Sequence, residues 1–156
     1  MTLENLHVEI GQAAPEFEVM DQNGEKVSLS SFKGSKNVLI MFYPYAFSGK
    51  CTSELCELRD NLSVFQNDAV QLLAISCDPI FTQRAFAEAE GYKFPVLSDF
   101  WPHGQVAKAY GVFDEAHGNA VRGSFLIDKE GTLRWQVNNG RDVRNIDDYK
   151  AAIAAL

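Results

Sequence analysis

Residues 38–58 read VLIMFYPYAFSGKCTSELCEL, and they predict a buried strand that leads into a helix. Val38 to Tyr43 is an unbroken run of apolar residues, many of them β-branched or aromatic, which indicates a strand buried on both faces and ended by Pro44. Beyond the proline, apolar residues recur at intervals of three and four and predict one helical stripe; they are Leu55, Leu58, Leu62 and Phe65. This pattern places Cys51 near the N-terminus of the helix.

That position favours the reactive form of the Cys51 side chain. The free N–H groups and the positive dipole end at a helix N-terminus stabilise a thiolate, which is the nucleophilic form of cysteine. Ser48 precedes Cys51 by three residues and is a suitable N-cap, and Gly49 lets the backbone approach whatever lies in front of the helix. Cys51 is therefore a candidate nucleophile, although a buried thiol that only packs is the alternative interpretation of the same pattern.

The remaining chain alternates strand and helix patterns and contains no internal repeat. Phe17 to Met20 and Lys26 to Leu29 predict an N-terminal β-hairpin. Further strands are expected at Val70 to Ser76, Ser124 to Ile127 and Leu133 to Val137, and helices at Phe81 to Glu90, Gln105 to Tyr110 and Asp147 to Leu156. Alternating strands and helices followed by a second hairpin predict an α/β fold with a mixed sheet, in a single domain that spans residues 1–156.

Composition excludes several classes of protein. A net charge of −7 argues against a nucleic-acid-binding surface, and the chain has no apolar run of the roughly 20 residues that cross a membrane. The opening Met1 to Leu6 lacks the charged and then apolar pattern of a signal peptide. Three cysteines are an odd number for a secreted disulfide framework. We therefore expect a cytoplasmic enzyme without a membrane or nucleic-acid partner.

Several motifs resemble those of the peroxiredoxin family. Pro44, Ser48 and Cys51 fit the pattern Pro-x-x-x-Thr/Ser-x-x-Cys, with serine where threonine is commoner. The stretches 14–17 (APEF) and 29–34 (LSSFKG) are similar to the N-terminal part of the family, and 122–128 (RGSFLID) to its active-site arginine segment. Residues 98–104 (SDFWPHG) look like the AhpE-type bacterial subgroup. The resemblance covers nearly the whole chain and implies a thioredoxin-like fold.

The resemblance also implies a reaction and a set of site residues. Cys51 would attack a hydroperoxide and become a sulfenic acid, without a cofactor. Ser48 and Arg122 would contribute hydrogen bonds to the site, Pro44 would shield the thiolate from water, and Glu54 would aim the arginine. Expected partners are the hydroperoxide substrate and a reductant, which is a thioredoxin, a mycoredoxin-like redoxin or a low-molecular-weight thiol. A homodimer is also implied.

The role of Cys56 stays open at this point. The Cys-x4-Cys spacing resembles peroxiredoxins of the bacterioferritin-comigratory-protein type, in which the second cysteine resolves the sulfenic acid as an intramolecular disulfide. Five residues along an ideal helix separate two Cα atoms by roughly 8.6 Å. A disulfide needs about 4.4 to 6.8 Å, so the helix would have to unwind. The alternative is a one-cysteine enzyme recycled by an external thiol, with Cys56 only packing. Cys77 is expected to be a core thiol, with resolution as its alternative role.

Other features allow competing interpretations. Aromatic residues near the motifs are expected to form core and dimer contacts, or an apolar collar that favours bulky hydroperoxides; they are Phe42, Tyr43, Tyr45, Phe47, Phe100 and Trp101. His103 and His117 lack the spacing of a metal-ligand pair, so no metal is expected. A thiol–disulfide oxidoreductase would normally present Cys-x-x-Cys, which is absent. A peroxide sensor or holdase remains a second candidate function.

Overall fold

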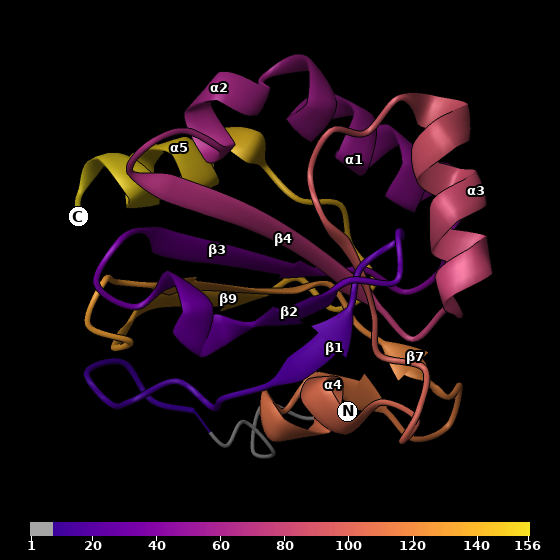
Figure 1. The fold of residues 1–156 in the computed structure, drawn as a ribbon, viewed down its shortest axis with the longest axis horizontal. Helices are drawn as coiled ribbons and strands as arrows, with labels where there is room; N and C mark the ends of the chain where they lie inside the picture. Colours follow the sequence, from indigo (N-terminus) through magenta and orange to yellow (C-terminus); the bar gives the residue numbers. More distant parts are fainter. Residues whose placement is uncertain (1–7) are drawn as a thin grey trace.

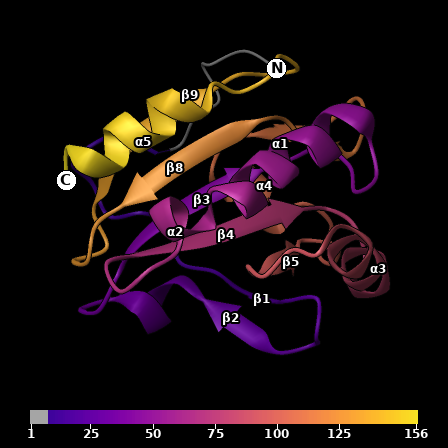
Figure 2. The same cartoon turned by 90° about the horizontal axis from the view of Figure 1, so that it is seen from above.

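The computed structural model describes residues 8–156, and it contains a seven-stranded mixed sheet with helices on both faces (Figures 1 and 2). The strands, in their order across the sheet, are β2 (Lys26–Ser28), β1 (Glu18–Met20), β5 (Val96–Ser98), β4 (Val70–Ser76), β3 (Asn37–Phe42), β8 (Gly123–Ile127) and β9 (Leu133–Asn138). β3, β4 and β5 are parallel, whereas β8, β9 and the β1–β2 hairpin pair antiparallel. The predicted α/β class, with a mixed sheet and an N-terminal hairpin, is confirmed. Residues 1–7, on which the expectation about a signal peptide rests, lie outside the described residues.

The side chains of the central strands alternate between two hydrophobic clusters, one on each face of the sheet. On one face, Leu39 and Met41 of β3 belong to a cluster with residues of α1 (Gly49–Asp60), α2 (Leu62–Phe65), α3 (Ile80–Glu90) and α5 (Ile146–Ala154). On the other, Ile40 and Phe42 belong to a cluster that includes α4 (Gln105–Ala109) and a short 3-10 helix (Leu29–Phe32). Figure 1 shows α1, α2, α3 and α5 above the sheet and α4 below it. The continuous apolar run of β3 follows from this double burial.

The order of the strands brings distant parts of the chain to one end of β3. β3 ends at Phe42, shortly before Pro44, and the loop that follows leads into α1. β8 runs antiparallel to β3, with Met41 opposite Ser124, so the residues just before β8 lie beside the C-terminal end of β3. The N-terminus of α1 and the start of β8 therefore meet at the same edge of the fold.

The predicted helical stripe turned out to belong to two helices rather than one. α1 ends at Asp60 and α2 begins at Leu62, because Asn61 leaves the helical backbone at φ −121° and ψ 27°. The Asn61 side-chain amide donates to the carbonyl of Glu57 at 2.9 Å, an alternative to helix continuation that asparagine offers more readily than most residues. Leu55, Leu58 and Phe65 are still buried on the same face of the sheet.

Three short strands were not predicted. β5 has three residues, and β6 (Phe113–Asp114) and β7 (Asn119–Ala120) form a two-stranded sheet of two residues each. None of the three is long enough to show a period of two, and none was marked by a signal like the turn at Asn23 and Gly24 that identified the equally short β1 and β2. The predicted boundaries of the longer elements agree with the structure within two residues. Among residues 8–156, no helix has the length and apolar character needed to span a membrane.

Candidate active site

Cys51 lies in the first turn of α1, as the sequence predicts. Ser48 is the N-cap, and its hydroxyl accepts a hydrogen bond from the backbone N–H of Cys51 at 3.3 Å. The carbonyl of Ser48 accepts from the N–H of Thr52 at 2.9 Å, which closes the first turn. The Cys51 side chain is completely buried, so its sulfur is shielded from bulk water. A thiolate at this position interacts with the positive end of the helix at short range.

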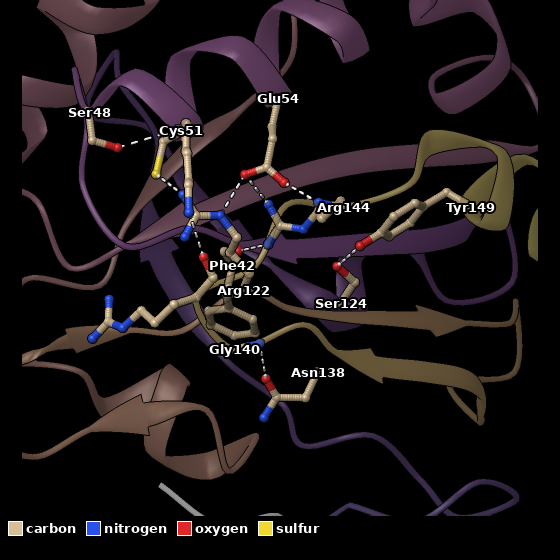
Figure 3. Close-up of polar contacts among 12 residues, drawn as sticks. Phe42, Ser48, Cys51, Glu54, Arg122, Ser124, Asn138, Gly140, Arg144 and Tyr149 are labelled. Carbon is tan, nitrogen blue, oxygen red and sulfur yellow. Dashed lines mark hydrogen bonds and ion pairs between the residues drawn. The ribbon is translucent and has the colours of Figure 1, made fainter.

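Arg122 and Glu54 come together at Cys51, although they are far apart in sequence (Figure 3). Nη2 of Arg122 donates to Sγ of Cys51 at 3.2 Å, and Nε of the same guanidinium donates to Oε1 of Glu54 at 2.6 Å. Arg122 comes directly before β8, and its backbone is fixed on both sides, since its N–H bonds to Gly140 and its carbonyl to Asn139, each at 2.9 Å. The structure therefore brings together three of the predicted site residues.

Arg144 is a third charged residue of this cluster, and the sequence did not predict it. It lies in the loop between β9 and α5, and its backbone N–H donates to Oε2 of Glu54 at 2.8 Å. Its guanidinium contacts the carbonyl of Phe42, and Nη1 lies 3.7 Å from Oε1 of Glu54. Burial lowers the pKa of Arg144, and the positive charge of Arg122 lowers it further. An irregular loop carries no periodic pattern, so nothing in the sequence distinguished this arginine from a surface cation.

The charge of the cluster has a direct consequence for Cys51. The side chains of Arg122, Arg144 and Glu54 are 5%, 3% and 8% exposed, so water screens their charges only weakly. Two guanidinium groups and one carboxylate leave one positive charge uncompensated beside the sulfur. A Cys51 thiolate balances that charge, whereas a neutral thiol does not. The cluster can therefore stabilise negative charge that forms on the sulfur or on a substrate oxygen beside it.

The loop between β3 and α1 is held in an unusual backbone conformation. Phe47 has φ 68°, in the left-handed region that a bulky side chain seldom occupies. Its ring packs on Phe86 with 5.0 Å between the ring centroids, and the N–H of Ala46 donates to Oδ2 of Asp78 at 2.8 Å. Pro44, the fifth predicted site residue, is buried in this loop. Asp78 is a second residue that the sequence did not single out, and its bond to Ala46 holds the backbone of this loop shortly before Ser48.

Cys56 lies apart from this cluster. It is partly buried, and its Sγ donates to Oε2 of Glu90 at 3.4 Å and lies 3.6 Å from the hydroxyl of Tyr92. Cys51, Cys56 and Cys77 are all free thiols in this structure. The cysteine pair therefore occupies two different environments of one helix, with Cys51 facing the arginines and Cys56 facing the end of α3.

Cys77 follows β4 and belongs to the core on the opposite face of the sheet. Burial raises the pKa of Cys77 to about 12, and the carboxylates of Asp99 and Asp78 act in the same direction. A thiol with such a pKa stays protonated near neutral pH and is a poor nucleophile.

The aromatic residues near the motifs divide into two groups. Phe42 and Tyr43 are fully buried in the core, as expected. Tyr45, Phe47, Phe100 and Trp101 are exposed, Trp101 to 83%. His103 and His117 bond to other groups, His103 through Nε2 to the carbonyl of Gly118 at 2.6 Å and His117 through Nδ1 to Oδ2 of Asp114 at 2.8 Å. Within residues 8–156, no group of three or more side chains has an arrangement suited to a metal ion.

Comparison with known proteins gives consistent matches across the chain. Residues 10–136 match the AhpC/TSA family. The chain is 46% identical over 148 residues to alkyl hydroperoxide reductase E of Mycobacterium tuberculosis, an alignment that covers 94% of this chain and 97% of the relative. It is 37% identical over 144 residues to peroxiredoxin Bcp of Escherichia coli, covering 85% of this chain and 90% of the relative.

Solved structures match over the same range. The crystal structure of peroxidoxin BcpB from Mycobacterium tuberculosis superposes with a TM-score of 0.85 at 30% identity, covering 96% of this chain and 99% of the other. The crystal structure of Enterococcus faecalis AhpC gives a TM-score of 0.85 at 30% identity, covering 95% and 92% of the two chains. The thioredoxin-like fold expected from the sequence motifs is confirmed by these matches.

Proposed function

The chain belongs to the AhpC/TSA family and is a thiol-dependent peroxidase, and we propose that Cys51 is the residue that reduces the hydroperoxide. The observation that carries this assignment is the bond from Arg122 to Cys51, made by a buried guanidinium that Glu54 holds from its other edge. Of the three cysteines, Cys51 is the one with a helix N-terminus and a buried cation beside its sulfur.

In the proposed reaction, the Cys51 thiolate attacks one oxygen of the hydroperoxide. A sulfur–oxygen bond forms, the oxygen–oxygen bond breaks, and the second oxygen leaves as an alkoxide or hydroxide that takes up a proton. Cys51 is thereby oxidised to a sulfenic acid and the peroxide is reduced to an alcohol or water. Arg122 would stabilise the developing negative charge with its donors, the N–H of Cys51 and the Ser48 hydroxyl would contribute further bonds, and Pro44 would keep water from the sulfur.

We propose that Glu54 and Arg144 act by positioning Arg122. Glu54 accepts from Arg122 through Oε1 and from the backbone of Arg144 through Oε2, so its carboxylate is fixed at both oxygens. A fixed carboxylate in turn orients the Arg122 guanidinium. The hydrogen bond from Nε fixes the direction of the N–H group, and the rest of the planar guanidinium follows because rotation about the Nε–Cζ bond is restricted. This arrangement supports an arginine that is oriented before the substrate arrives.

We propose that Cys56 resolves the sulfenic acid as an intramolecular disulfide. The Cys56 sulfur would attack the Cys51 sulfur, the sulfur–oxygen bond would break, and water would leave. The alternative is a one-cysteine enzyme in which an external thiol performs this step, and it is favoured by the contacts that hold Cys56 toward α3. A peroxide sensor or holdase that uses Cys51 as a switch remains a further candidate. Cys77 would stay a structural thiol.

The substrates, the reductant, the oligomeric state and the location of the enzyme are further parts of the proposal. We propose hydrogen peroxide and organic hydroperoxides as substrates, and a thioredoxin, a mycoredoxin-like redoxin or a low-molecular-weight thiol as reductant. We also propose that residues 1–156 form a single domain in a cytoplasmic homodimer. The exposed aromatic side chains of Tyr45, Phe47, Phe100 and Trp101 support either a dimer contact or a collar for bulky hydroperoxides. Sedimentation and a comparison of hydrogen peroxide with a fatty-acid hydroperoxide test these two roles.

Turnover of peroxide in the presence of a reductant tests the assignment of Cys51. Cys51→Ser should consume no peroxide above the uncatalysed rate, whereas Cys77→Ala should keep the wild-type rate. Cys56→Ser should lose turnover with a thioredoxin system and keep it with a low-molecular-weight thiol. Consumption of only one equivalent by the wild-type protein, with every reductant supplied, would instead support the sensor.

A further inference from the structure

The Cys56 thiol belongs to a small cluster of hydrogen-bonded polar groups outside the active site. Its Sγ lies 3.4 Å from Oε2 of Glu90, the last residue of α3, and 3.6 Å from the hydroxyl of Tyr92, two residues further on. Arg59 reaches the same place from α1, since its Nη1 donates to the carbonyl of Glu90 at 2.6 Å and lies 3.8 Å from Oε2. The cluster therefore joins the middle of α1 to the C-terminal end of α3.

Tyr92 also supports the backbone of α1. Its hydroxyl donates to the carbonyl of Thr52 at 3.3 Å. In an α-helix the carbonyl of residue 52 pairs with the N–H of residue 56, so Tyr92 braces the peptide group that bonds to Cys56. This helical bond must break if Cys56 is to approach Cys51, because an intact helix keeps the two residues too far apart for a disulfide.

The Tyr92 side chain is held in place by aromatic packing. The Tyr92 ring stacks on Phe94 with centroids 5.0 Å apart and meets Phe86 edge to face at 5.1 Å. Tyr92 is only 5% exposed, and burial raises its pKa, so the hydroxyl remains protonated at neutral pH. Packing on the aromatic core therefore holds the Tyr92 ring in addition to the bonds of its hydroxyl.

We propose that Tyr92 and Glu90 are positioning residues that retain Cys56 on the wound helix and thereby set the rate of the resolving step. This proposal rests on the proposed function, in which Cys56 resolves the Cys51 sulfenic acid. In the reduced enzyme the Cys56 thiol donates its one hydrogen to Glu90, and the Tyr92 hydroxyl donates its one hydrogen to Thr52. Both bonds hold the segment between the two cysteines in its helical form.

Ionisation of Cys56 removes the bond to Glu90. A thiolate has no hydrogen to donate to Glu90, and the carboxylate of Glu90 repels it. The sulfur then attacks Cys51, a sulfur–sulfur bond forms, and the hydroxide released from the sulfenic acid takes up the proton that Cys56 lost, which gives water. The oxidant is the hydroperoxide already consumed at Cys51.

A slow release of Cys56 has a measurable cost to the enzyme. While the sulfenic acid waits, a second hydroperoxide can oxidise it to sulfinic acid, which inactivates Cys51. The contacts of Tyr92 and Glu90 therefore lengthen the lifetime of the sulfenic acid and leave it more open to overoxidation. Loosening them should favour the disulfide over the sulfinic acid.

The test measures the two chemical steps separately in Tyr92→Phe and Glu90→Gln. Rapid acid quench and mass spectrometry after one equivalent of hydrogen peroxide give the rates of sulfenic acid formation and of disulfide formation. Tyr92→Phe keeps the ring and should speed disulfide formation by about three- to tenfold, the factor that the loss of one hydrogen bond represents. Sulfenic acid formation should keep its wild-type rate. Glu90→Gln should act in the same direction.

Two further readouts separate this role from general destabilisation. The peroxide concentration that converts half of Cys51 to sulfinic acid should rise by the same factor as the resolving rate, and hydrogen exchange should increase in residues 52–60. Tyr110→Phe is the matched control, because it removes one buried tyrosine bond, to the carbonyl of Pro15 at 2.7 Å, on the other face of the sheet. It should leave both rates unchanged.

The outcomes distinguish the inference from the function on which it rests. Equal rates of disulfide formation in wild type, Tyr92→Phe and Glu90→Gln would overturn the positioning role, as would a parallel change in sulfenic acid formation and disulfide formation. Neither result would affect the proposal that Cys56 resolves the sulfenic acid. If wild-type protein forms no disulfide at any time, resolution by Cys56 fails and the inference falls with it. Circular dichroism of the reduced proteins establishes that each variant is folded, and either variant suffices for the comparison.

Discussion

Arg122 donates a hydrogen bond to the sulfur of Cys51 across a separation of 71 residues in the sequence. The contact depends on β8 pairing with β3, which brings the residue before β8 to the helix that follows β3. Glu54 then fixes the arginine from one turn further along α1. The chemistry of the thiol is thus determined jointly by a local feature, the helix N-terminus, and by a contact that only the complete sheet creates.

Replacing Glu54 by glutamine should slow peroxide attack and destabilise the fold. The change leaves two buried guanidinium groups without a counter-charge, which typically costs about 3 kcal/mol in the free energy of unfolding. A misdirected Arg122 should lower the second-order rate constant for peroxide about tenfold. Urea unfolding and stopped-flow kinetics measure the two effects. Glu57→Gln, an exposed position on the same helix, is the control and should change neither by a measurable amount.

Arg144→Met should affect the rate of peroxide attack more than the free energy of unfolding. Among the described residues, Nε and Nη1 of Arg144 have no hydrogen-bond partner, so burying this cation is unfavourable. The backbone bond from residue 144 to Glu54 survives the substitution. We expect unfolding free energy within about 1 kcal/mol of wild type and peroxide attack about threefold slower, because one positive charge near Cys51 is lost. A loss of stability as large as that of Glu54→Gln would refute this ranking.

Asp99 should make the folded protein less stable as the pH rises from 4 to 6. Its carboxylate accepts from the N–H groups of Val106 and Ala107 at 3.0 and 2.9 Å, yet burial raises the pKa of Asp99 from 3.8 to about 6. Between these values the folded protein binds a proton that the unfolded chain does not. Stability from this group is therefore present below pH 4 and is lost as the pH rises through 6, by up to about 3 kcal/mol.

The measurement is the free energy of unfolding of wild type and Asp99→Asn as a function of pH. The difference between the two proteins should change with pH between 4 and 6 and be flat above 7. A difference that is constant from pH 4 to 7 would contradict the shifted pKa.

Oxidation should change the helix content if Cys56 resolves the sulfenic acid. Formation of the disulfide requires α1 to unwind between the two cysteines, since five residues of ideal helix separate the Cα atoms by roughly 8.6 Å. We expect a weaker helical signal in far-ultraviolet circular dichroism and faster hydrogen exchange in residues 48–60 of the oxidised protein. Cys56→Ser, treated in the same way, should keep the reduced spectrum. An unchanged spectrum in a protein with a verified Cys51–Cys56 disulfide would refute the unwinding.

The features that could be predicted from the sequence are those that local patterns encode. The strand before Pro44, the Ser48 cap and the position of Cys51 each depend on a few neighbouring residues, and the structure has all three. Arg122 and Glu54 were singled out by family resemblance, since no local pattern relates them. Their contact could not have been derived from spacing, because it arises from the pairing of β8 with β3.

The features that could not be predicted are those that depend on tertiary contacts. Arg144 and Asp78 lie in loops, where a charged residue is by default a surface residue, and only the structure shows what they bond. Asn61 interrupts a stripe whose apolar spacing continues into the next helix. The contacts of Cys56 were equally hidden, because Glu90 and Tyr92 are more than 30 residues away.

The most direct test of the central claim is the mass of the reduced protein after one equivalent of hydrogen peroxide, compared between wild type, Cys51→Ser and Cys56→Ser. We predict that wild type loses two hydrogens as it forms the Cys51–Cys56 disulfide, that Cys56→Ser gains one oxygen on Cys51, and that Cys51→Ser is unchanged. Rapid oxidation of Cys51→Ser at Cys56 or Cys77, or an unmodified Cys51 in Cys56→Ser, would contradict the assignment of Cys51 as the residue that attacks peroxide.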